Sequence, residues 1–528
     1  MELLPELCIP FLLAVTVILL ATSWFISKKQ SKPRTASNRL PPGPWKLPII
    51  GNLHQLIISS EPAHRRLREL SRKYGPVMQL QLGELHHVVV SSAEAARDVL
   101  KTHDAALASR PYVLAADVIF YGQKGIAFTP YGAYWRQMRK ICMMELLSDR
   151  RVLSYRSVRE DELSCNMVRR IFLSSQKKMT TDDHRVNLGE ILFWASNRVI
   201  AMSAFGAIRE NTESFMAVVN SISDVLGGMT VSDLYPSVKF LPTLTGFRSK
   251  LNRLHRAADV LLDEIIKEHL ARRAVAGKEQ AAVYIVDVLL DLQENCTDLE
   301  SPLTNDNIKA VATVSTYPEL ILGDLLLGAS GTSTITIEWT MAELMRNPRV
   351  MKKVQEEIRQ AFRGGGRVDE ARIEELKYTN AVIKEALRMH PDGPLLGPRE
   401  SQVDVVVDGY LVPARTKVIV NAWAIGRDPQ FWDDAETFHP ERFLDCSVDY
   451  RGTDFQFVPF GAGRRMCPGL AFGMATVKLG LTNLLYHFDW KLPDGMKPEE
   501  LDMTETFGLT LRRKNPLCLI PVAYNPVA

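Results

Sequence analysis

The stretch PFGAGRRMCPG, residues 459–469, carries the strongest indication of fold and chemistry in this chain. It places Cys467 behind several small residues and two arginines, Arg464 and Arg465. Positive charge and nearby backbone N–H groups favour a thiolate, the form of cysteine that binds metal ions. Pro468 and Gly469 can lead into a helix whose N-terminal dipole also favours an anion. The alternative, a buried free cysteine at a loop-to-helix junction, is the commoner role of an isolated cysteine.

The remaining composition excludes several classes of protein. The formal charge of +3 and an ordinary globular composition give no sign of nucleic-acid binding. An odd number of widely spaced cysteines argues against a disulfide framework and against a structural zinc site. The seven are Cys8, Cys142, Cys165, Cys296, Cys446, Cys467 and Cys518. We therefore expect the bulk of the chain to lie in a reducing compartment.

The N-terminus has the pattern of a membrane anchor. Residues 7–26 carry no charge and are long enough to span a bilayer as a helix. Basic residues follow this segment, which predicts a lumenal N-terminus and a cytosolic body. A cleaved secretory signal is the alternative, but the residues that precede the segment are acidic.

The organisation predicted from these patterns has three parts. Residues 1–30 form the anchor, residues 31–52 form a basic and proline-rich hinge, and residues 53–528 form one catalytic domain. Prolines stiffen the hinge and favour an extended conformation. No linker, low-complexity tract or internal repeat divides the body, although 528 residues would allow more than one domain.

Hydrophobic periodicity predicts a mainly helical body with a smaller β portion near its two ends. Alternation predicts strands at 77–82 and 87–90, and Ser91 with Glu94 has capping-box spacing for the helix that follows. Apolar residues at three- and four-residue steps predict helices. These helices cover 254–273, 338–347 and 380–390. A late strand pair is predicted within 508–522, with Asn515 and Pro516 at its turn.

The cysteine loop resembles the haem-binding signature F-x-x-G-x-R-x-C-x-G of the cytochrome P450 family, and the match runs from Phe460 to Gly469. The resemblance implies a P450 fold in which helices enclose a haem b. It implies that Cys467 is the axial thiolate ligand of the iron, that Arg465 pairs with a propionate, and that Phe460 packs beside the thiolate. Thiolate ligation favours O–O cleavage, which lets such enzymes oxidise unactivated C–H bonds.

Further motifs along the chain agree with this resemblance. Glu385 and Arg388 match the E-x-x-R motif, and Arg442 in PERF can complete a buried charge triad, whereas a Glu/Arg pair alone is usually a solvated helix face. By the same resemblance, Trp135 and Arg139 in WRQMR, together with Arg399, hold a propionate. The segments LPPGPW, YGAYWRQMRK and NAWAIGRDP resemble those of plant microsomal members that hydroxylate terpenoids and alkaloids.

The oxygen-activating helix departs from the family pattern at one position. Thr332 in GASGTS matches the threonine that assists oxygen activation, and it is the predicted catalytic residue. The preceding acidic position is Gly331, so protons must come from elsewhere, and a substrate hydroxyl is one candidate source. The small residues also let a helix pass close to another group.

Two other segments depart from the family. Residues 312–320 are an apparent insertion, in which Pro318 predicts a break and a restart of the helix near Tyr317. The insertion is either a harmless loop or an incorrectly joined coding sequence. Asp392 stands where relatives carry an apolar residue or proline, and we expect it to face solvent rather than a polar group of the substrate.

The function implied is oxidation of a small hydrophobic plant metabolite by a haem-thiolate monooxygenase, with a terpenoid expected first and an alkaloid or phenolic second. Electrons are expected from NADPH–cytochrome P450 reductase, and the enzyme is expected in the endoplasmic reticulum membrane, facing the cytosol. Pocket walls are expected from 110–128 with Phe120 and Tyr121, from Leu326–Leu327, from Leu395–Leu396 and from 507–509. Gly331 leaves two alternatives: an isomerase or dehydratase that needs no oxygen, and an inactive ligand-binding relative.

Overall fold

The computed structural model describes residues 39–57, 61–176, 184–206, 218, 221–226, 230–276, 284–295, 319–506, 508 and 510–524. The predicted anchor at 7–26, Pro318 and Tyr317 lie outside the described residues. In the part of the chain that is described, no helix is both long and apolar enough to cross a bilayer.

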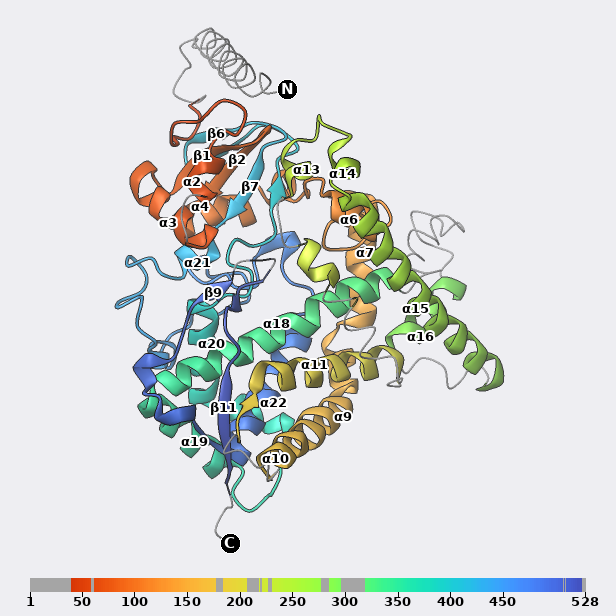
Figure 1. Ribbon diagram of the computed structural model, residues 1–528, viewed down its shortest axis with the longest axis vertical. Helices are drawn as coiled ribbons and strands as arrows, with labels where there is room; N and C mark the ends of the chain where they lie inside the picture. The colour runs from red at the N-terminus through yellow and green to blue at the C-terminus, as the bar shows by residue number, and fades with distance from the viewer. Residues whose placement is uncertain are drawn as a thin grey trace, which may run out of the picture.

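Helices make up most of the body, as the periodicity predicts (Figure 1). In the first half these are α2 (Leu53–Ile57), α3 (Ala63–Tyr74), α4 (Ala93–Arg97), α5 (Asp104–Leu107), α6 (Leu114–Ile119), α7 (Ala133–Ile141), α8 (Asp149–Ser154), α9 (Arg156–Arg159), α10 (Val168–Gln176), α11 (Leu188–Phe205), α13 (Val231–Leu234), α14 (Leu241–Leu244) and α15 (Phe247–Ala276). The second half adds α16 (Ile285–Asn295), α18 (Glu319–Arg346), α19 (Pro348–Ala361), α20 (Lys377–Met389), α21 (Ala422–Ile425) and α22 (Leu470–His487).

Helix α18 runs through the middle of the molecule and packs against α11, α20 and α22 (Figure 1). Its close approach to α22 depends on Gly480, where a Cβ would lie 2.9 Å from Ile337 Cδ1. Both helices are apolar around their circumference, which is typical of helices buried on all sides. Their packing brings the N-terminal end of α22, and with it Cys467, beside α18.

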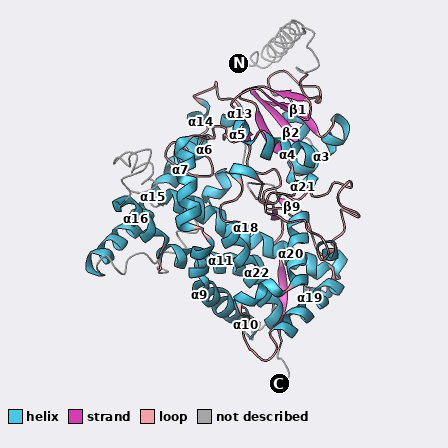
Figure 2. Cartoon of the chain, turned by 180° about the vertical axis from the view of Figure 1, so that it is seen from behind, coloured by secondary structure: helices cyan, strands magenta, loops and turns pink. Residues whose placement is uncertain are grey.

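A four-stranded sheet lies at one end of the helical body (Figure 2). Its order is β1 (Val77–Leu82), β2 (Leu85–Val90), β7 (Lys417–Val420) and β4 (Arg399–Glu400). Strand β2 pairs antiparallel with β1 and parallel with β7. Strand β4 begins directly after the loop that contains Asp392 and Leu396, and it pairs with β7.

The predicted capping of the helix after β2 is wrong by one residue. Ser92, not Ser91, is the N-cap of α4, and its side chain accepts from Ala95 N at 3.3 Å. Ser91 is still extended, since its N–H donates to Pro76 O at 2.8 Å across the end of the strand pair. The sheet ladder therefore takes precedence over the capping-box spacing.

The C-terminal strands pair differently from the prediction. Strand β10 (Arg512–Arg513) pairs with β9 (Glu505–Thr506), whereas β11 (Cys518–Ala523) lies between β3 (Val186–Asn187) and β8 (Phe488–Lys491). Asn515 and Pro516 therefore connect two sheets rather than two strands of one hairpin. Both edges of β11 are occupied by distant segments, which local alternation cannot reveal. Strands β5 (Val405–Val407) and β6 (Tyr410–Val412) form a separate hairpin.

Candidate active site

The loop that contains Cys467 is held by glycines and by one buried aspartate. Gly461 and Gly463 have φ of +67° and +68°, and a Cβ at Gly463 would lie 2.2 Å from Leu100 O. Asp104 on α5 accepts from the backbone N–H and from Nη1 of Arg464, both at 2.9 Å. The N–H of Cys467 donates to Phe460 O at 3.0 Å, which closes the loop. Only glycine combines that backbone conformation with so close an approach.

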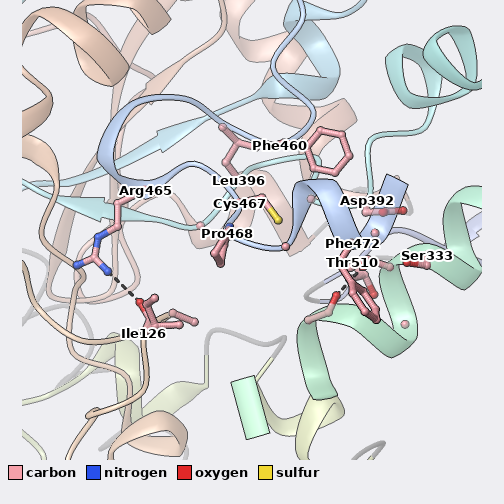
Figure 3. A pocket seen from close by; sticks show the side chains of 18 of the residues that line it. Ile126, Ser333, Asp392, Leu396, Phe460, Arg465, Cys467, Pro468, Phe472 and Thr510 are labelled. Carbon is pink, nitrogen blue, oxygen red and sulfur yellow. Dashed lines mark hydrogen bonds between the residues drawn. The ribbon is translucent and has the colours of Figure 1, made fainter. Parts of the chain in front are cut away.

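Cys467 lies at the wall of a cavity of about 430 Å³ (Figure 3). Burial raises the pKa of its thiol, while the backbone N–H of Gly469 and the guanidinium of Arg139 lower it. The cavity extends from this loop to α18, where Gly328, Thr332 and Ser333 form the facing wall. Its lining is mostly apolar and includes Phe460 beside Cys467. The arrangement suits a large hydrophobic ligand in contact with one thiolate.

Three partly buried cations, Arg110, Arg139 and Arg465, line one edge of the cavity. Arg465 donates to Ala108 O at 2.7 Å, and its guanidinium carbon lies 4.2 Å from the centre of the Trp135 ring. Burial and the neighbouring arginines lower the pKa of Arg465 to about 8. Burial lowers the pKa of Arg110 to about 9.

Arg399 lies beside this edge but does not line the cavity. Its Nη1 donates to Asp104 Oδ1 at 2.6 Å and its Nη2 to Ala462 O at 3.0 Å. A role for Arg399 in holding a propionate stays a prediction. Sequence reasoning missed Arg110, whose Nη1 donates to Pro398 O at 2.7 Å. Its position at the start of the segment 110–128, which was expected to line the pocket, is the signal that could have revealed it.

The motif at Glu385 and Arg388 forms the buried triad that was predicted. Arg388 Nε and Nη2 donate to the two Glu385 oxygens at 2.8 Å each, and Arg442 Nε donates to Oε1 at 3.1 Å. The side chains of Glu385 and Arg388 are both 0 % exposed. Arg388 also donates to Gly426 O and Ala435 O, at 2.7 and 2.8 Å. The triad therefore ties α20 to the segment that leads to the cysteine loop.

On α18, Thr332 lines the cavity, and its hydroxyl donates to Gly328 O at 2.6 Å. Among the described atoms outside the nearby backbone of α18, only Arg512 Nη2 would lie within 4 Å of a Cβ at Gly331, at 3.8 Å. The space for an acidic side chain is therefore present, with a guanidinium beside it. The small residues let α18 pass along the cavity, as expected.

The expectation that Asp392 faces solvent is wrong. Asp392 lines the cavity, and its Oδ2 lies 3.0 Å from Thr336 Oγ1 on α18. Burial raises the pKa of this carboxyl group to about 8. The backbone carbonyl of Asp392 accepts from Leu511 N at 2.8 Å. This hydrogen bond joins the loop that contains Asp392 to the residue before β10.

The predicted pocket walls are correct in part. The segment 110–128 lines the cavity through Val113, Ile126 and Phe128 among others, but not through Phe120 or Tyr121. Phe120 is buried against Phe128, and the Tyr121 hydroxyl bonds to Asp259 on α15. Leu396 lines the cavity, whereas Leu395 packs on the sheet. The described part of the chain does not include the side chains of Leu326 and Leu327, nor residues 507 and 509.

Comparison with known proteins decides the family. A family model of cytochrome P450 matches residues 41–519. The chain is a cytochrome P450.

This P450 is 47% identical over 521 residues to a desmethyl-deoxy-podophyllotoxin synthase of Sinopodophyllum hexandrum, with 98% of each chain covered. It is 46% identical over 519 residues to a 5-epiaristolochene 1,3-dihydroxylase of Nicotiana tabacum, covering 98% of this chain and 99% of the relative. A zebra fish P450 structure determined with progesterone superimposes with a TM-score of 0.71 at 23% identity, covering 88% of this chain and 100% of that one. The last similarity shows the fold alone.

The residues of the cavity fit the haem-thiolate cofactor that the family implies. No described carboxylate forms an ion pair with Arg110, Arg139 or Arg465, although cations partly removed from water are stabilised by a nearby anion. Two propionates would supply that charge at this edge, and Cys467 lies on the cavity wall as the thiolate donor. A haem held in this way supplies the activation of molecular oxygen.

The chain contributes binding, positioning and exclusion of water. Cys467 would ligate the iron, while the arginines and Trp135 would hold the propionate edge. Phe460 would lie beside the sulfur, and the apolar walls would orient a hydrophobic substrate against α18. The Thr332 hydroxyl is one of the proton-bearing groups on the facing wall, with those of Ser333 and Thr336.

Proposed function

We propose that this P450 oxidises a small hydrophobic plant secondary metabolite, with a terpenoid as the substrate class. The observation that carries the proposal is the apolar cavity of about 430 Å³ between Cys467 and α18. Relatives of similar length are named as a premnaspirodiene oxygenase and a 5-epiaristolochene 1,3-dihydroxylase, which supports the terpenoid class. We propose haem b as the cofactor, because Cys467 is the only described cysteine on the cavity wall, which leaves no second thiol for covalent attachment.

The test is co-expression with a plant NADPH–cytochrome P450 reductase, the proposed electron donor. Microsomes are supplied with NADPH and a panel of terpenes, alkaloids and phenolics, and products are identified by mass spectrometry. We expect a product one oxygen atom heavier from at least one terpene, dependent on NADPH. Product from alkaloids or phenolics alone would contradict the substrate class. Conversion without NADPH would instead identify the isomerase or dehydratase activity that Gly331 suggested.

Thr332→Ala is expected to lower the product formed per NADPH consumed by about tenfold, because it removes a proton-bearing group that faces Cys467 across the cavity. Substrate binding is expected to change little, since the hydroxyl is already bonded to Gly328 O. The measurement compares NADPH oxidation, hydrogen peroxide release and product in the same reaction. Unchanged coupling would contradict the role of Thr332.

Gly331→Asp gives the complementary variant. The new carboxylate would lie beside Arg512, whose Nη2 is 3.8 Å from the position of the added Cβ. An increase in product per NADPH would show that the missing acid limits proton supply in the natural chain. An unchanged ratio would show that protons reach the cavity by another route.

We propose that the enzyme is held on the endoplasmic reticulum membrane with its catalytic body in the cytosol. The apolar segment 7–26 supports this, as do exposed apolar side chains of the two segments that contact the β1–β2 turn. They are Trp45, Ile49, Ile57, Phe240 and Leu244, each at least 65% exposed. The hinge contacts this turn through a hydrogen bond from Gly83 N to Ile50 O. The segment before α14 contacts it through a hydrogen bond from Glu84 N to Leu234 O, at 2.9 Å.

Removing residues 1–30 is expected to leave residual binding to vesicles, which Phe240→Ser with Leu244→Ser then abolishes. Each buried Phe or Leu contributes about 2 kcal/mol to insertion, so the double change weakens binding by at least about a hundredfold. Flotation with phosphatidylcholine–phosphatidylserine vesicles measures the bound fraction. Val275→Ser, at a side chain that is 91% exposed on α15, is the matched control. Equal loss in the control would exclude a specific membrane face.

A further inference from the structure

Asp392 places a carboxyl group in the wall of a cavity that is otherwise mostly apolar. In Figure 3 it lies with Ser333 and Thr510 on one side of Cys467, while Arg465 lies on the other. The carboxyl group is therefore at the substrate end of the cavity, away from the arginines that would hold the cofactor. Neither ligation of the iron by Cys467 nor the propionate edge involves this carboxyl group.

The hydrogen bonds around Asp392 favour a neutral carboxyl group. Thr336 Oγ1 lies 3.0 Å from both Asp392 Oδ2 and the carbonyl oxygen of Thr332. A hydroxyl has one proton, and a carbonyl can only accept. When that proton is directed at Asp392 Oδ2, the carboxyl oxygen accepts from Thr336, and a proton carried on Oδ2 stays available to a ligand in the cavity. The other oxygen, Oδ1, is buried and has no hydrogen-bond partner among the described residues. An ionised carboxylate would leave that oxygen charged and unpaired, which is costly.

A second polar group lies at the same end of the cavity. Arg512 lines it, and no described carboxylate forms an ion pair with this guanidinium, whose Nε donates to Thr510 Oγ1 at 3.4 Å. The contact between Leu511 N and Asp392 O joins the two segments directly beside these side chains. A neutral carboxyl group and a guanidinium both have protons to donate, and both lie in the wall of a mostly apolar cavity. A ligand made only of hydrocarbon has no hydrogen-bond acceptor for these protons.

We infer that Asp392 and Arg512 form a polar anchor that selects a substrate already carrying an oxygen acceptor, such as a carbonyl group, on an otherwise hydrocarbon skeleton. The inference rests on the proposed function, because it concerns the substrate of the same cavity. The Asp392 oxygen that can form a hydrogen bond with the substrate is Oδ2, since Oδ1 is enclosed by protein. The reaction that supplies such a substrate is therefore an oxidation of the parent hydrocarbon.

The test is binding, measured by the spectral shift of the ferric haem in the purified full-length enzyme. The ligands are matched pairs on a shared terpene skeleton, valencene with its ketone nootkatone and limonene with its ketone carvone. In the natural chain we expect the ketone to bind about fivefold to tenfold more tightly than the hydrocarbon, as one or two hydrogen bonds would give. Equal dissociation constants within each pair would overturn the inference.

Variants separate the anchor from general packing. Asp392→Leu is expected to remove the preference for the ketone while leaving hydrocarbon binding within about twofold, because it removes only the hydrogen bond. Asp392→Asn, which keeps a neutral donor, is expected to retain most of the preference. Arg512→Met gives an independent variant if Asp392→Leu yields no haem protein. Asp445→Asn, at an exposed aspartate away from the cavity, is the matched control. An unchanged ketone preference in both Asp392→Leu and Arg512→Met would overturn the anchor.

Failure of this inference is distinguishable from failure of the proposed function. If the anchor is absent, the reduced, CO-treated enzyme still shows the thiolate spectrum and still oxidises terpenes, but without preference for oxygenated ones. If the proposed function is wrong, terpene oxidation itself is missing.

Discussion

Cys467→Ala is expected to abolish the red-shifted Soret band that the reduced, CO-treated enzyme shows, together with all monooxygenase activity. The shift is a property of thiolate ligation, and Cys467 is the only described cysteine in the cavity wall. Alanine leaves the backbone of the loop intact, because the N–H of Cys467 already bonds to Phe460 O through the main chain. Loss of the band is therefore expected without loss of the fold.

The control is Cys165→Ala, which removes an exposed thiol that does not line the cavity. It is expected to keep both the band and the activity. Cys467→Ser adds a second comparison, since an alkoxide is a poorer ligand than a thiolate at neutral pH. A band at the normal position in Cys467→Ala would show that another residue binds the iron, and the assignment of the site would then be wrong.

Glu385→Gln and Arg388→Met are expected to prevent accumulation of haem-containing protein. Both side chains are fully buried, and removing one partner of a buried ion pair costs about 3–5 kcal/mol. That cost is a large part of the roughly 5–15 kcal/mol by which domains are stable. Arg388→Lys is expected to fail as well, because one ammonium group cannot replace the five hydrogen bonds that Arg388 donates to Glu385, Gly426, Ala435 and Thr437.

The measurement is the ratio of haem protein, from the CO difference spectrum, to total protein, from immunoblotting. Arg349→Met is the matched control, since Arg349 is 67% exposed and pairs with Glu441 at the surface. Surface pairs contribute about 0–1 kcal/mol, so the control is expected to retain its haem. Normal haem content in Glu385→Gln would show that the triad is dispensable for folding.

Much of the fold could be predicted because the relevant signals are local. Strand β1 and helices α15 and α20 follow from periodicity within single segments. The pairing of β11 with β3 and β8 could not be predicted, because both partner strands lie far from β11 along the chain. The N-cap of α4 shows the same limit of local signals. The capping-box spacing of Ser91 is local, whereas the hydrogen bond from Ser91 N to Pro76 O, which keeps Ser91 from capping, belongs to the sheet ladder.

The sequence by itself determined the chemistry of this P450, since Cys467 and the triad at Glu385 and Arg388 are defined by residue type and spacing within short motifs. Only the tertiary structure decided how the remaining polar groups are used. It directs Arg399 to Asp104, adds Arg110 to the cavity edge, and turns Asp392 toward Thr336 instead of solvent. A motif specifies which groups a segment carries. The partner of a buried charge, however, comes from distant segments. Because an unpaired buried charge is costly, the packing of those segments decides which partner each charge takes.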